Sequence, residues 1–115
     1  MYNESKFNVD FLPEAVEFLN NLDAKTREKI YYNIRKAQYI NDKELFKKIS
    51  DFIWEFRTLY EGKNYRLFAF WDKIDRKETL VVATHGILKK TQKAQAKELK
   101  KAEEIRKHYL ENKAK

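Results

Sequence analysis

The sequence contains no cysteine, only one proline and only two glycines among its 115 residues. Disulfide bonds and thiolate metal sites are therefore excluded, and we expect the protein in a reducing cytoplasm. Two glycines cannot build the glycine-rich loop that holds nucleotide phosphates in many enzymes. No apolar run approaches the roughly 18 residues of a membrane span. The N-terminus is not a signal peptide, so we expect no membrane partner.

Positive charge is concentrated at one end of the chain. The net charge is +7, and residues 89–115 hold ten Lys and Arg against four Asp and Glu. Residues 1–88 hold fifteen against fourteen. This asymmetry is typical of a protein with a polyanionic partner, most commonly nucleic acid. The alternative is a lysine-rich helix face that only aids solubility.

The N-terminal part of the chain predicts one strand followed by two helices. Phe7, Val9 and Phe11 alternate with polar residues, which indicates a strand over about residues 6–12. Apolar residues then recur at helical spacing from Pro13 to Leu22. A second helical pattern covers residues 23–40. The short link between them predicts an antiparallel helical hairpin.

The rest of the chain predicts three strands and a helix within one domain, residues 1–115. Aromatic and β-branched residues fill 51–60, 65–72 and 78–86, separated by the polar turns "EGKN" and "KIDRK". This pattern is typical of an antiparallel meander. About residues 92–115 form a basic C-terminal helix. The element order predicts an α+β fold with helices packed on a sheet.

The remaining candidates for chemistry are cationic. No acidic cluster or histidine pair has metal-ligand spacing, so we expect no metal and no cofactor. No serine or cysteine stands in a recognisable nucleophile setting. Arg57, Arg66 and His85 lie at or near the ends of predicted strands and could converge at one sheet edge. Strict alternation puts His85 on the same sheet face as Val81 and Ala83.

This set of side chains suits a scissile phosphate. Arginine binds phosphate by two hydrogen bonds and stabilises charge in the transition state. Histidine can exchange a proton with an attacking or leaving oxygen, and Lys89 can stabilise an oxyanion. RNA supplies its own nucleophile, the 2′-hydroxyl, so the set permits cleavage of RNA without a metal. The alternative is that His85 is an ordinary surface residue and that Glu55 and Arg57 are surface charges.

Three motifs in order carry a resemblance to a known family. "WEFR" at 54–57, "YRLFAFW" at 65–71 and "THGILKK" at 84–90 precede the basic helix. This arrangement resembles the RelE/ParE superfamily of bacterial type II toxins, and within it the HigB-like, phage-derived branch. Two positions depart from the pattern. Ile87 stands where that branch has phenylalanine, and "KAQAKE" replaces a common Thr-Pro.

The resemblance implies a RelE-like toxin that cleaves mRNA on the ribosome. The partners that the resemblance implies are the ribosome, mRNA and a cognate antitoxin of the helix-turn-helix type. The implied residues fall into a catalytic group and an RNA-binding group. The catalytic group is Arg57, Arg66, His85 and Lys89, and the RNA-binding group is Lys90, Lys93 and Tyr65. Two alternatives remain: a ParE-like inhibitor of DNA gyrase, and a basic nucleic-acid-binding protein without catalysis.

Overall fold

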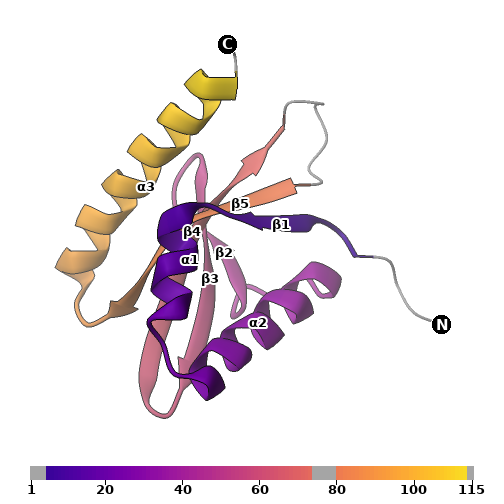
Figure 1. The fold of residues 1–115 in the computed structure, drawn as a ribbon, viewed down its shortest axis with the longest axis vertical. Coiled ribbons are helices and arrows are strands. Elements are labelled where there is room, and N and C mark those ends of the chain that lie inside the picture. Colours follow the sequence, from indigo (N-terminus) through magenta and orange to yellow (C-terminus); the bar gives the residue numbers. More distant parts are fainter. Residues whose placement is uncertain (1–4, 74–79, 114–115) are drawn as a thin grey trace.

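The computed structural model describes residues 5–73 and 80–113, without the side chains of residues 92–94. The elements follow in the order β1, α1, α2, β2, β3, β4, β5 and α3 (Figure 1). The helices are α1 (Pro13–Asn20), α2 (Ala24–Tyr39) and α3 (Gln92–Lys113). The strands are β1 (Asn8–Phe11), β2 (Phe46–Lys48), β3 (Ile53–Tyr60), β4 (Lys63–Asp72) and β5 (Leu80–Lys89).

The predicted α+β class is confirmed, and the sheet is larger than the predicted meander. Its strand order is β1-β5-β4-β3-β2. The β3–β4–β5 meander forms the centre, β1 adds parallel to β5, and β2 adds antiparallel to β3. The sequence analysis did not predict β2, because three residues are too few to show alternation. The turn predicted at residues 73–77 lies outside the described residues, except for Lys73.

The turn between β3 and β4 has the expected chemistry. Glu61 and Gly62 are its two central residues, and both have positive φ, 50° and 76°. Two successive positive φ values give the turn whose twist matches antiparallel strands, and glycine adopts this conformation without steric cost. The strands on either side therefore pair in an uninterrupted register from Tyr60 and Lys63 inward.

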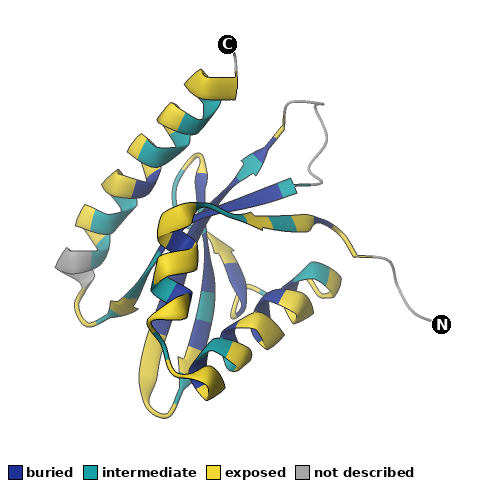
Figure 2. Cartoon of the chain, viewed as in Figure 1, coloured by how far each residue is buried: buried dark blue, intermediate teal, exposed yellow. Residues whose placement is uncertain are grey.

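Helices cover both faces of the sheet, so the protein has three layers. On one face α1 packs mainly on β5 and α2 mainly on β3. They bury a core that includes Leu19, Ile30, Phe56 and Leu67. On the other face α3 packs over a smaller core. Figure 2 shows the buried strands between helices whose outer surfaces are exposed.

A β-bulge in β5 decides which face carries His85. Phe68 of β4 pairs with His85, but the next residue, Ala69, pairs with Ala83. Thr84 is thus an extra residue, and the alternation of side chains shifts by one beyond it. His85 faces α3 beside Phe68, not the α1 side with Ala83, which corrects the prediction from strict alternation. Gly86 in turn faces Phe18 of α1.

Candidate functional site

The two predicted arginines lie opposite each other on neighbouring strands. Arg57 of β3 pairs with Arg66 of β4, in the interior of both strands and not at their ends as predicted. The Nε atom of each lies 3.5 Å from Oε1 of Glu55. Burial lowers the pKa of Arg66, and the Glu55 charge partly opposes this. Arg57 is more accessible, with 24% of its side chain exposed.

Glu55 is the residue whose importance the sequence analysis missed. The sequence analysis considered it only as a surface charge, in the alternative interpretation, yet it is buried with 2% exposure. Its Oε2 accepts a hydrogen bond of 2.8 Å from the Gln95 side chain of α3. A buried carboxylate costs several kcal/mol unless cations or donors compensate it, and here both are present. The signal available in sequence was its place on the same strand face as the core residue Ile53.

A hollow of about 380 Å³ opens beside this cluster, between the sheet and α3. Glu55 and Arg57 line it together with Lys47 of β2 and Lys89 of β5. Gln95 of α3 closes its other side. Three cations and one carboxylate give the hollow a positive balance. It can therefore accept an anionic group such as a phosphate.

His85 lies next to this cluster but beneath α3. It is 3% exposed, and its ring stacks on Phe68 with 5.1 Å between centroids. Nε2 lies 2.8 Å from Oε2 of Glu98 in α3, and Nδ1 lies 3.0 Å from the Thr84 hydroxyl. Burial lowers the pKa of His85, and the hydrogen bond to Glu98 partly opposes this. Nε2 donates to Glu98, and the Thr84 hydroxyl, whose oxygen lies beside Nδ1, donates to the Phe68 carbonyl oxygen at 3.3 Å. Burial favours the neutral ring.

Acidification is expected to destabilise the wild type more than a His85→Asn variant. In the unfolded chain the His85 imidazole takes up a proton at about pH 6.5. In the folded chain burial lowers the pKa of His85, so protonation needs a lower pH. The stability contributed by neutral His85 is therefore complete above about pH 6.5 and lost as the pH falls below it. Urea unfolding of both proteins at about pH 7.5 and about pH 5 measures the difference.

The ion pair of Glu14 with Lys101 provides an internal control for this measurement. The hydrogen bond from Lys101 lowers the pKa of Glu14, so this pair also loses stability in acid. The pair is present in both proteins, and the His85 charge is the smallest of the influences on the Glu14 pKa. Equal losses of unfolding free energy in wild type and His85→Asn would contradict the assigned role of His85.

The other predicted RNA-binding residues do not all join the hollow. Tyr65 is buried in the core on the α1 and α2 side, on the opposite sheet face from Arg66. Lys90 is exposed directly after β5. Lys93 belongs to α3, but its side chain lies outside the described part of the structure. The structure therefore brings together Arg57, Arg66 and Lys89, and places His85 beside them under α3.

Tyr109, near the end of α3, has a structural partner. Its hydroxyl donates a 2.6 Å hydrogen bond to Oδ2 of Asp72, which also accepts from Lys113 at 2.7 Å. Asp72 is buried at the end of β4. Tyr109 lies fourteen positions after Gln95 in α3, about 21 Å along the helix axis. It therefore anchors the end of α3 and does not reach the hollow.

Within residues 5–73 and 80–113, no group of three or more His, Asp or Glu side chains could hold a metal ion. In the same part of the chain, no helix has both the length and the apolar character needed to cross a bilayer.

Comparison with known proteins identifies the family. The family described as phage derived protein Gp49-like (DUF891) matches residues 17–107. The matched region contains Glu55, Arg57, Arg66, His85 and Lys89. A search of curated proteins found no match. The chain belongs to the Gp49-like family of phage-derived proteins, a family of RelE-like toxins of toxin–antitoxin systems.

Proposed function

We propose that this protein is a HigB-like toxin that cleaves mRNA on the ribosome and thereby halts translation. The observation that supports this most directly is the basic hollow beside α3, where Arg57 and Lys89 lie next to the Glu55 carboxylate. A site with several cations and a carboxylate can both bind a phosphodiester and move a proton. Those are the two requirements of RNA cleavage that uses the 2′-hydroxyl.

The proposed reaction is an intramolecular displacement at phosphorus. The 2′-oxygen of the RNA forms a bond to the adjacent phosphorus and gives up its proton. The bond from phosphorus to the 5′-oxygen breaks, and that oxygen takes up a proton. The products are a 2′,3′-cyclic phosphate and a 5′-hydroxyl end. Arg57, which lines the hollow, binds the non-bridging oxygens, and Lys89 stabilises the charge that develops in the transition state. Arg66 is buried behind the hollow, and its proposed role is exerted through its ion pair with Glu55.

Proton transfer is assigned to His85 together with Glu55. Glu55 lines the hollow and is placed to accept the proton of the 2′-hydroxyl. His85 must first take up a proton, because a neutral imidazole is too weak an acid to protonate the 5′-oxygen. Departure of Glu98 from Nε2 exposes the ring and removes the burial that lowers its pKa. The imidazolium then donates its proton to the 5′-oxygen. The toxin thus has to shift α3 near Glu98 when RNA binds. Such a step fits an enzyme that is inert until the ribosome positions its substrate.

The positive charge of the toxin surface supports contacts with the RNA backbone and with an acidic segment of the antitoxin. Lys90 is exposed at the end of β5 and Lys93 lies in α3, so both are assigned contacts with the RNA backbone. The ribosome presents the mRNA, and positioning supplies much of the rate. The cognate antitoxin, of helix-turn-helix type, is proposed to cover the basic surface with an acidic segment.

The test is cleavage of a defined mRNA in a reconstituted translation system with the purified toxin. We expect cuts inside the translated frame, with 5′-hydroxyl ends, and almost none in the same mRNA without ribosomes. A single 2′-deoxynucleotide at the cut position should abolish that cut, because the nucleophile is missing. Growth arrest on expression without any mRNA cut would contradict the proposal and favour gyrase inhibition. Strong cutting of naked RNA would contradict ribosome dependence.

A further inference from the structure

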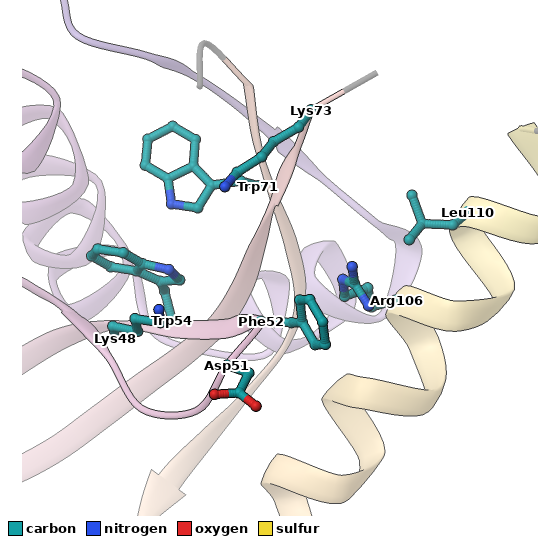
Figure 3. A pocket seen from close by; sticks show the side chains of 8 residues that line it. All are labelled: Lys48, Asp51, Phe52, Trp54, Trp71, Lys73, Arg106 and Leu110. Carbon is teal, nitrogen blue, oxygen red and sulfur yellow. The ribbon is translucent and has the colours of Figure 1, made fainter. Parts of the chain in front are cut away.

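A second hollow lies at the other end of α3, away from the candidate catalytic residues. Its volume is about 360 Å³, within the size range of small-molecule sites. Figure 3 shows it between the end of the sheet and the last turns of α3. Its aromatic lining residues are Phe52, Trp54 and Trp71. Its cationic lining residues are Lys48, Lys73 and Arg106.

The aromatic walls are incompletely covered. Phe52 is 53% exposed, and the guanidinium of Arg106 lies 3.9 Å from the centroid of its ring. Trp54 and Trp71 meet edge to face, with 6.1 Å between centroids and planes at 87°. Exposed aromatic surface is a feature that a ligand can cover.

The chemistry of this hollow fits a flat ring attached to an anion. The aromatic rings offer stacking or edge contacts to a planar group, and Arg106 is already stacked on Phe52. Lys48 and Arg106 provide positive charge, and Asp51 is the acidic residue in the lining. A nucleotide of single-stranded RNA combines these properties in one unit, a base with a π-face and a phosphate.

The two hollows lie along one path. Lys47 of β2 lines the first and Lys48, the next residue, lines the second. On α3, Ala96 lines the first and Arg106 lines the second, about 15 Å further along the helix. Neighbouring residues of a strand face opposite sides of a sheet, so Lys48 and Trp54 lie on the face opposite Lys47 and Glu55. An RNA strand that leaves the first hollow therefore turns around the β2 edge to reach the second, with Phe52 and Arg106 on the α3 side of this turn.

We propose that the hollow of Phe52, Trp54 and Trp71 binds a base of the RNA strand whose phosphate occupies the Arg57 hollow. The proposal rests on the proposed function for the identity of the ligand. It deepens that function by assigning a base-binding subsite that holds the RNA at a point remote from the cut. Because stacking tolerates every base, this subsite adds affinity with little sequence preference.

Intrinsic fluorescence tests this subsite directly, because Trp54 and Trp71 are the only tryptophans of the chain and both line it. A single-stranded RNA of about ten nucleotides, within the length such sites cover, is titrated into the toxin in the absence of ribosomes. We expect quenching of tryptophan fluorescence. Phe52→Ala should weaken binding about tenfold to a hundredfold, the usual effect of removing one stacking ring.

The matched control is Leu59→Ala, which truncates an exposed apolar side chain at the other end of β3 and should leave binding unchanged. Circular dichroism confirms that each variant is folded. RNA binding without quenching, or with equal affinity in Phe52→Ala, would overturn the subsite. Quenching by an acidic aromatic peptide but not by RNA would also overturn it, in favour of a protein ligand. The assay needs no cleavage, so its outcome is independent of the ribonuclease test.

Discussion

Replacing Arg57 by alanine is expected to lower the rate of ribosome-dependent mRNA cleavage about 100- to 1000-fold. That is the usual cost of removing one preorganised donor to a developing negative charge. Arg57 lines the hollow with its side chain partly exposed, so its guanidinium is available to a phosphate. Single-turnover cleavage of a defined mRNA on purified ribosomes measures the effect without interference from product release.

Arg57 is a cleaner choice than Arg66 for this experiment. Arg66 is buried, and its loss would leave the buried Glu55 with less compensation and destabilise the fold. In Arg57→Ala, Arg66 still pairs with Glu55. Arg57→Lys keeps the positive charge but loses the bidentate hydrogen bonding of a guanidinium, so we expect a cleavage rate between those of the wild type and Arg57→Ala.

The matched control for charge is Arg35→Ala, which removes one exposed cation from α2, on the other side of the sheet. It should cleave at the wild-type rate. Arg57→Ala with wild-type activity would exclude this arginine from the site. Equal losses in Arg57→Ala and Arg35→Ala would mean that only net charge matters, as in a non-catalytic nucleic-acid binder.

Gly86→Ala is expected to lower the free energy of unfolding by about 1–3 kcal/mol, the usual cost of overpacking. A Cβ at this position would lie 2.3 Å from Cδ2 and 2.7 Å from Cγ of Phe18. The Cγ contact is close to the helix backbone, so rotation of the ring alone cannot relieve it. Urea unfolding of the purified protein measures the loss.

The double variant tests the assigned cause. In the Phe18→Ala background the clash is absent, so Gly86→Ala should lower the free energy of unfolding much less than it does alone.

Gly62→Ala is the control. No atom lies within 4 Å of a Cβ there, but φ is +76°, so its cost is backbone strain. That cost should be unaffected by Phe18→Ala. Additive losses for Gly86→Ala and Phe18→Ala would contradict packing of α1 on β5 through these two residues.

Local patterns predicted most of the secondary structure. The helical spacing after Pro13, the turn at Glu61 and Gly62, and the three aromatic strands all appear in the structure near their predicted bounds. These features depend on neighbouring residues in the chain, so a single sequence contains them. The three-residue strand β2 was missed because its strand conformation depends on pairing with β3.

The candidate site was predicted in its residue types and only partly in its geometry. Arg57, Arg66 and Lys89 were singled out from sequence and share one face of the sheet. Glu55 was treated as a surface charge, because its burial depends on the cover that α3 provides. His85 was placed on the wrong face, because a bulge is a property of two paired strands and not of one.

The sequence by itself determined the cationic residues, the absence of thiol chemistry, the order of the three helices and of every strand except β2, and the motifs that relate the chain to RelE-like toxins. These follow from residue types and short-range spacing, which a linear sequence contains in full. Only the tertiary structure decided that Glu98 covers His85, that Gln95 reaches Glu55, and that Arg106 of α3 stacks on Phe52, just before β3. Those contacts join residues far apart in the chain, and their positions are fixed by strand register and by the packing of α3.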